Sequence, residues 1–148
     1  MKVKTFIPFS LLLFACLGFN DDDDQNSDLE NSILGLWNIT AIHNSSPQGR
    51  TLGPGDGEVI EITFKDDGSF MGSTSVNSFG GSYRVMGDLL TISEFMTTEV
   101  SDTFYGVAFY GALDDSFNST TNFNEFKLSL ENDILTLNFN YCLFRFRN

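Results

Sequence analysis

The side chains that could perform acid–base or nucleophilic chemistry are few and scattered in this sequence. The only histidine, His43, stands between an apolar run and a polar loop, which favours a solvent-exposed position over a role in proton transfer. Two acidic pairs, Asp66-Asp67 and Asp114-Asp115, occupy an expected turn and an expected helix end. We therefore predict no catalytic residue, and a hydrolase that uses serine or carboxylate groups is an alternative.

Metal and cofactor chemistry also lacks its usual ligands. A transition-metal site normally takes histidine, cysteine or spaced carboxylates. The run Asp21-Asp22-Asp23-Asp24 lacks the spacing and the glycine turn of a dedicated calcium loop. No glycine-rich run follows a strand and opens a helix, as a phosphate-binding loop does. The sequence predicts no metal site and no cofactor.

The first fifteen residues have the layout of a bacterial export signal. Lys2 and Lys4 precede an apolar stretch that runs from Phe6 to Ala15. This stretch covers about half of the ~20 residues that a helix needs to cross a bilayer, which argues against a permanent membrane span. We expect residues 1–15 to be a removable signal peptide.

The end of this signal, Leu13-Phe14-Ala15-Cys16, resembles the lipobox of bacterial lipoproteins. The resemblance implies that Cys16 becomes the lipid-bearing first residue, and acyl chains such as palmitate would then anchor the protein in a membrane. An ordinary secretory signal with an incidental cysteine is the alternative. A thioether at Cys16 would leave Cys142 as the one free thiol, which we expect to be a small buried hydrophobic residue.

Residues 16–32 are expected to form an acidic, flexible and extended tether. Residues 20–30 carry six carboxylates and no basic side chain, and almost nothing apolar that could offset the entropy of ordering. An acidic run directly after a lipidated cysteine resembles the surface-export signal of Bacteroidota lipoproteins. This resemblance implies an outer membrane lipoprotein of the cell envelope that faces outward, with a periplasm-facing attachment as the alternative.

The charge balance argues against nucleic acid as a partner. The chain of 148 residues has a formal net charge of −12, and removal of residues 1–15 would leave 6 basic and 20 acidic residues, a net charge of −14. Such a surface repels phosphate. The expected partners are the membrane, through the N-terminal lipid, and an envelope protein.

Residues 33–148 have the patterning of one mostly β domain. Hydrophobic residues make up 41% of the chain, and 16 Phe and 13 Gly favour short strands joined by turns. A hairpin turn is expected at Lys65-Asp66-Asp67-Gly68, and irregular loops at residues 44–57 and 75–79. The expected strands cover residues 34–41, 60–64, 70–74, 82–85, 89–93, 126–130, 135–138 and 142–147.

Residues 101–117 fit two interpretations. Phe104, Ala108 and Ala112 recur at helical spacing, and Asp102 could cap such a helix. The aromatic side chains of the segment fit a strand as well. The residues alone leave both open.

The segment Gly72–Tyr83 resembles the signature G-x-x-G-C-N-x-F/Y-x-G-x-Y of META/HslJ-like domains. The matching residues are Gly72, Asn77, Phe79, Gly81 and Tyr83. The chain departs from the family at Ser75-Val76, where Gly-Cys is frequent, and near Ser101, where a second cysteine is frequent. These two departures together are consistent with a lost disulfide.

The META resemblance spans about residues 34–146 and carries expectations of fold and function. It implies an open, or cracked, antiparallel β-barrel of about eight strands with one short helix, a fold also known from a secretin pilot lipoprotein, and so favours the helix near residues 102–117. It is consistent with a non-catalytic envelope domain that binds a protein or assembly partner, and the family is linked to envelope stress. The five matching residues are expected to be structural, with Asn77 and Gly81 stabilising a turn or a bulge.

A second resemblance is to Bacteroidota lipocalin-like lipoproteins. They share a Leu-x-Gly-x-Trp opening, here at Gly35 and Trp37, a Phe-x-x-Asp-Gly turn that ends at Gly68, and a Gly-x-Tyr strand that includes Tyr83. This resemblance implies a small closed barrel that carries a small apolar ligand. A scaffold domain and a ligand carrier differ in one structural respect. In a scaffold five aromatic residues would fill the interior, and in a carrier they would line an open pocket. These residues are Trp37, Phe64, Tyr83, Phe126 and Phe144.

Overall fold

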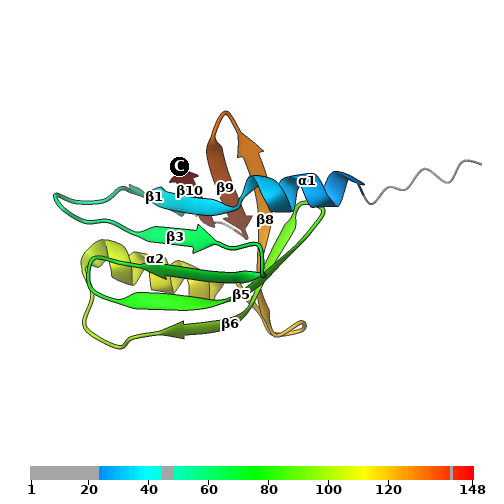
Figure 1. Ribbon diagram of the computed structural model, residues 1–148. Coiled ribbons are helices and arrows are strands. Elements are labelled where there is room, and N and C mark those ends of the chain that lie inside the picture. Colours follow the sequence, from blue (N-terminus) through cyan, green and yellow to red (C-terminus); the bar gives the residue numbers. More distant parts are fainter. Residues whose placement is uncertain (1–23, 45–48, 141) are drawn as a thin grey trace, which may run out of the picture.

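The computed structural model describes residues 24–44, 49–140 and 142–148, which form a strongly curved antiparallel sheet and two helices (Figure 1). In chain order the elements are α1 (Asp24–Ser32), β1 (Gly35–Asn44), β2 (Thr51–Leu52), β3 (Glu61–Phe64), β4 (Ser69–Ser73), β5 (Ser78–Met86), β6 (Leu89–Thr97), α2 (Phe104–Asp115), β7 (Phe117–Asn118), β8 (Phe123–Glu131), β9 (Ile134–Phe139) and β10 (Cys142–Arg147). The mostly β architecture predicted from the sequence is confirmed.

Eight strands form a closed ring in the order β1-β3-β4-β5-β6-β8-β9-β10, and β10 pairs with β1 to complete it. The prediction of an open barrel is therefore wrong. Closure depends on the length of β1, which runs beyond the expected strand to Asn44. One edge of β1 pairs with β3 over Gly35–Asn38, and the other edge pairs with β10 over Asn38–Asn44.

The eight ring strands correspond one to one to the eight strands expected from alternation. The main differences lie in the loops. Two residues of the loop expected at 44–57 form β2, which pairs with the end of β1, and β5 already begins at Ser78 inside the loop expected at 75–79. The turn after β3 is where the sequence predicted it.

Helix α1 occupies part of the segment expected to be an extended tether. Leu29 packs against the core, Ile33 just after the helix is fully buried, and the indole nitrogen of Trp37 donates to the Ile33 carbonyl at 2.7 Å. Leu29 and Ile33 are four residues apart, so a helix places both on the face that meets the barrel. The expectation of an extended chain is wrong for residues 24–32, and residues 16–23 lie outside the described part.

Helix α2 shows that the helical interpretation of residues 101–117 is the correct one. Thr103 caps it, because its hydroxyl accepts from the Gly106 N–H at 3.1 Å. Tyr105 and Phe109 face the interior, and the Tyr105 hydroxyl donates to the Ile39 carbonyl at 3.1 Å. The helix runs along one end of the barrel beside β5 and β6 (Figure 1).

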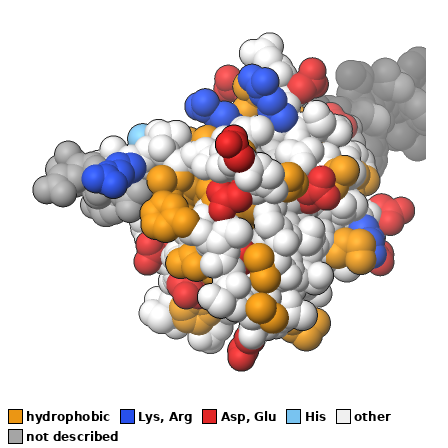
Figure 2. Space-filling model, turned by 90° about the vertical axis from the view of Figure 1, so that its left-hand side faces the viewer, with side chains coloured by type: hydrophobic (Ala, Val, Ile, Leu, Met, Phe, Trp, Pro, Cys, Tyr) orange, Lys and Arg blue, Asp and Glu red, His pale blue; other side chains and the backbone are white. Residues whose placement is uncertain are grey.

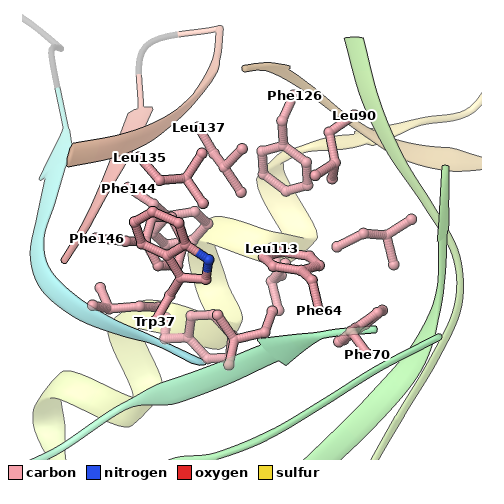
Figure 3. Close-up of a cluster of buried hydrophobic side chains, with 14 of the residues drawn as sticks. Trp37, Phe64, Phe70, Leu90, Leu113, Phe126, Leu135, Leu137, Phe144 and Phe146 are labelled. Carbon is pink, nitrogen blue, oxygen red and sulfur yellow. The ribbon is translucent and has the colours of Figure 1, made fainter. Parts of the chain in front are cut away.

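The core is one continuous cluster to which every ring strand and α2 contribute. Figure 3 shows aromatic and aliphatic side chains that point into a shared interior, with Trp37, Phe144 and Phe126 among them. Inward residues alternate with outward ones, as in β9, where Leu135 and Leu137 are buried.

Candidate functional site

The barrel interior is filled by side chains. Five aromatic residues were expected either to fill the interior or to line an open pocket. All five are buried: Trp37, Phe64, Tyr83, Phe126 and Phe144. Ring centroids lie 4.9 Å apart for Phe64 and Tyr83 and 6.0 Å apart for Phe126 and Phe144. The void between the core side chains measures about 10 Å³, the space of roughly one water molecule. A small-molecule site usually needs about 300 Å³ or more, so this void does not accommodate such a ligand.

Two signature glycines lie where neighbouring strands approach closely. A Cβ atom at Gly72 would overlap the carbonyl oxygen of Glu61 and the ring of Phe79. A Cβ atom at Gly81 would overlap the carbonyl oxygen of Glu94 on β6. Neither position leaves room for a side chain.

Strand β6 has a bulge where it passes Gly81. The register between β5 and β6 shifts between Gly81 and Tyr83, so that two residues of β6, Ser93 and Glu94, lie opposite one residue of β5. A bulge bends its strand and often ends pairing. Strand β6 pairs with β8 only over Leu89–Ile92, and its second half leaves β8.

Asn77 is buried and uses its whole side chain in hydrogen bonds. Its amide nitrogen donates to the Val100 carbonyl and to Oδ2 of Asp102, both at 2.8 Å. Its Oδ1 accepts from the Thr98 hydroxyl at 2.9 Å and from the Val100 N–H at 3.0 Å. These bonds tie the turn between β4 and β5 to the segment that joins β6 to α2.

Asp102 completes this hydrogen-bonded cluster. Its Oδ2 accepts from the Thr74 hydroxyl at 2.6 Å, and its Oδ1 accepts from the Thr103 N–H at 2.7 Å. Burial raises the pKa of Asp102, but the hydrogen bonds from Thr74, Asn77 and Thr103 outweigh burial and hold the pKa below its usual value. Asp102 could have capped α2, but the cap is the next residue, Thr103, whose hydroxyl accepts from the Gly106 N–H, while Asp102 accepts from Thr74 and Asn77.

The two aromatic signature residues face the core. Phe79 stacks on Phe95 at a centroid distance of 5.7 Å and contacts Phe109 at 4.9 Å. The Tyr83 hydroxyl donates to the Lys65 carbonyl at 2.7 Å, which joins β5 to the β3–β4 turn. Burial raises the pKa of Tyr83 to about 12.

The groups considered for catalysis lie on separate elements. His43, on β1, is half-buried rather than exposed, and its Nδ1 lies 2.7 Å from the Thr51 hydroxyl. Asp67 accepts from the hydroxyl and N–H of Ser69, which lowers the pKa of Asp67 and closes the β3–β4 turn. The pair Asp114-Asp115 is exposed at the end of α2. These residues do not form a shared site.

Lipid attachment and metal binding concern other residues. Cys16 lies outside the described residues, and Cys142 begins β10, where it pairs with Phe139. Among the described residues, no group of three or more His, Cys, Asp or Glu side chains could hold a metal ion. No helix in the described ranges is long and apolar enough to cross a membrane.

Open grooves border α2 on both sides. The groove toward β1 and β2 has a volume of about 240 Å³ and includes Ile42, Leu52 and Ala108. The groove toward β6 and β7 has a volume of about 380 Å³. Its lining residues are Phe95, Tyr110, Leu113, Asp114, Phe117 and Asn124.

Apolar side chains are also exposed at the end of the barrel where α2 begins. They are Val59, Val76, Val100, Phe104 and Val107. Figure 2 views this end and shows hydrophobic side chains interspersed with acidic and uncharged ones. The most exposed of them is Phe104, at 75%.

The first part of the chain matches a known family. Residues 30–102 fit the sequence model described as the META domain, and this stretch holds the five signature residues and ends at Asp102. Residues 30–102 belong to the META domain family. The matched META stretch includes β1 to β6 and the Asn77–Asp102 hydrogen bond, while α2 and β7 to β10 follow it. None of the curated proteins matches the chain.

Several solved structures are similar in fold to most of this chain, including the META stretch. A protein from Burkholderia xenovorans is 15% identical, with 82% of this chain and 87% of that chain covered and a TM-score of 0.59. A DUF4847 family protein from Bacteroides vulgatus is 18% identical, with 78% and 92% covered and a TM-score of 0.55. A lipocalin-like protein from Bacteroides uniformis is 17% identical, with 78% and 97% covered and a TM-score of 0.50. At such identities the likeness shows a shared barrel fold.

The sequence analysis did not single out the threonines that bond to the turn between β4 and β5, which contains Asn77. Thr74 and Thr98 lie 28 and 4 positions from Asp102, and both bond to the Asn77–Asp102 pair. Threonine is common in β proteins, so its presence gave no signal. A covarying pair of positions in related sequences would have been the signal to seek.

Proposed function

We propose that this protein is a non-catalytic, lipid-anchored domain of the cell envelope that binds a protein or assembly partner. The observation that supports this most directly is the packed interior, whose void of about 10 Å³ leaves recognition to the outer surface. Membership of residues 30–102 in the META family and the two open grooves beside α2 are consistent with a binding role. A role in envelope stress is an expectation of the family resemblance.

The anchor in this proposal is an acylated Cys16 behind a removable signal peptide. The acidic run that follows it favours attachment to the outer membrane with the domain facing outward. Cys16→Ser should move the protein from the membrane fraction to the soluble fraction, because the acyl chains would be absent. The control, Cys142→Ser, removes the other cysteine and should leave the protein in the membrane fraction. Membrane retention of the Cys16→Ser protein would contradict the anchor.

The partner is tested by chemical cross-linking of intact cells that carry the full chain with a C-terminal affinity tag. We expect the same envelope protein to be recovered in independent experiments from wild-type cells, and in lower yield from cells with Cys16→Ser. Failure to recover any reproducible partner would count against the proposed function.

The alternative function, a carrier of a small apolar ligand, has less support. The lipocalin-like neighbour shares the barrel fold, but the interior here is filled by core side chains such as Phe126 and Phe144. A carrier would need these side chains to move apart. Native mass spectrometry of the purified chain with and without long-chain fatty acid would detect such a complex.

A further inference from the structure

The second half of β6 forms an unpaired edge of the sheet. Beyond Ile92, β6 pairs with β5 alone within the described part of the chain. Strand β8 does not extend alongside it, because the chain turns at Asn122, with φ of 61°, and β8 begins at Phe123. Figure 1 shows this half of β6 along the lower margin of the barrel.

The ladder between β5 and β6 determines which backbone groups face the open edge. The Thr98 N–H donates to the Ser78 carbonyl at 3.0 Å, and antiparallel pairs alternate between hydrogen-bonded and non-hydrogen-bonded types. Phe95 and Thr97 therefore direct their N–H and C=O groups away from β5. In the described ranges these groups have no recorded backbone partner, which makes them a template for another strand.

Side chains next to this edge differ on its two faces. On the inner face, the groove of about 380 Å³ has aromatic walls from Phe95, Tyr110 and Phe117. On the outer face, Glu94 is exposed and Met96 is 69% exposed. An added strand would thus present alternate side chains to an aromatic groove and to a surface with a carboxylate.

The charged side chains of the segment that includes this edge are all acidic. Residues 93–126, which include β6 from Ser93 onward, α2 and β7, contain six acidic residues and no Lys, Arg or His. The acidic residues include Glu94 on the strand and Asp114 in the groove. Basic side chains on an incoming segment would complement this charge.

We propose that an extended segment of a partner protein adds to residues 93–97 of β6 as a new strand. Its main chain bonds to the free groups of Phe95 and Thr97, its apolar residues enter the groove, and its lysine or arginine residues lie beside Glu94. This assignment rests on the proposed partner-binding function and gives it a site. A second copy of this chain fits less well, because both copies carry a net charge of −12.

The test uses the detergent-solubilised full chain and two ten-residue peptides of the same composition. One peptide alternates lysine with phenylalanine, and the other has its five lysines before its five phenylalanines. We expect the alternating peptide to bind at least ten-fold more tightly and to slow hydrogen exchange at the amides of Phe95 and Thr97. Equal binding of both peptides would mean that charge attraction alone accounts for the affinity, and it would overturn the proposal. So would a lack of saturable binding of the alternating peptide at millimolar concentration.

A variant pair then locates the peptide on the edge. Thr97→Pro removes one outward N–H and should weaken binding of the alternating peptide at least ten-fold. Thr97→Ala keeps that N–H and should bind within two-fold of wild type. Equal binding of the two folded variants would overturn the proposal. If Thr97→Pro does not fold, N-methylation of alternate peptide residues replaces it: one methylated set should abolish binding and the other should not, and equal effects would overturn the proposal.

Two further outcomes separate this site from the proposed function. A cellular partner that is captured equally well by wild type and by Thr97→Pro would leave the function in place and remove β6 as its site. A dimer in sedimentation that Thr97→Pro dissociates would assign the edge to a second copy of the chain and overturn the assignment to a partner segment.

Discussion

At the scale of single residues, Gly81 shows how the absence of a side chain shapes the barrel. Gly81→Ala would place a methyl group on the carbonyl oxygen of Glu94, where the bulge of β6 leaves no free space. We expect the substitution to lower the free energy of unfolding by about 3 kcal/mol, the upper range for overpacking, as measured by urea denaturation.

Gly111→Ala is the matched control for this substitution. Gly111 lies on α2, and a Cβ atom there would meet nothing within 4 Å. Because alanine favours helix over glycine, Gly111→Ala should raise the free energy of unfolding by about 0.5–1 kcal/mol. Similar losses in the two variants would mean that close approach is not what makes Gly81 necessary.

Asp102 is the residue whose charge state should matter for stability in acid. Its pKa is held below the unfolded value of 3.8 by hydrogen bonds from Thr74, Asn77 and Thr103. The stability that these bonds add is present above about pH 4 and is lost as the pH falls through the lower pKa of the folded state. Asp102→Asn should lower the free energy of unfolding at pH 7 by about 1–3 kcal/mol. The unfolding temperature of the variant should also fall less than that of wild type between pH 5 and pH 3.

The exposed Glu99 provides the control for Asp102. It lies three positions earlier and has no recorded hydrogen bond within the described part of the chain, so Glu99→Gln should leave both stability at pH 7 and the acid profile nearly unchanged. If Asp102→Asn and wild type lose stability in parallel below pH 5, the hydrogen-bonded carboxylate is not the acid-sensitive group.

At the scale of elements, α2 begins with an N-cap at Thr103, one residue after Asp102, the cap expected from the sequence. The Thr103 hydroxyl accepts from the Gly106 N–H, and the interaction of Thr103 with Glu58 also lowers the pKa of that carboxyl group. We expect Thr103→Ala to lower the free energy of unfolding by about 1 kcal/mol, measured by thermal denaturation with circular dichroism. Ser101→Ala, at an exposed position just before the helix, should change it by less than about 0.5 kcal/mol.

The strands were predictable because alternation is a local property. Buried residues at every second position mark β9 and β3 in the sequence as clearly as they do in the structure. Barrel closure was not predictable in this way, because it depends on pairing of β1 with β10, whose partner residues lie 98 to 109 positions apart. Helix α1 was missed for a similar reason: its acidic residues mask Leu29, whose burial depends on contact with the barrel.

The hydrogen-bonded loop illustrates the same limit within the META stretch. Asn77 could be recognised from the signature, but its partners Val100 and Asp102 lie more than 20 positions away. Their contact exists only because β5 and β6 pair and α2 begins beside the β4–β5 turn. Long-range hydrogen bonds of this kind follow from the fold and cannot be derived from spacing.

At the scale of the whole molecule, a packed aromatic interior lies within an acidic exterior. The interior provides stability through buried rings, while the surface carries the net charge of −12 and the open grooves beside α2. Mutual repulsion within such a surface disfavours self-association and leaves the molecule suited to partners of the opposite charge. The proposed recognition of a partner would therefore depend on the surface, and the stability of the fold on the interior.

Phe126 allows the packed interior to be tested directly. It is 1% exposed, and its ring centroid lies 5.3 Å from that of Phe139 and 6.0 Å from that of Phe144. Phe126→Ala should cost about 3–5 kcal/mol in the free energy of unfolding, because it removes buried contacts and leaves a cavity. The exposed Phe117, replaced by alanine, is the control and should cost less than about 0.5 kcal/mol.

The same pair of variants distinguishes a packed barrel from a carrier. A dry apolar cavity binds small apolar molecules, so benzene should shift the core methyl resonances of the Phe126→Ala protein and leave those of wild type and Phe117→Ala unchanged. The reason is volume: the wild-type void of about 10 Å³ is too small for a benzene ring. Stoichiometric binding of benzene or of a fatty acid by the wild-type protein would mean that the aromatic core opens in solution, and the carrier function would then be the better interpretation of this barrel.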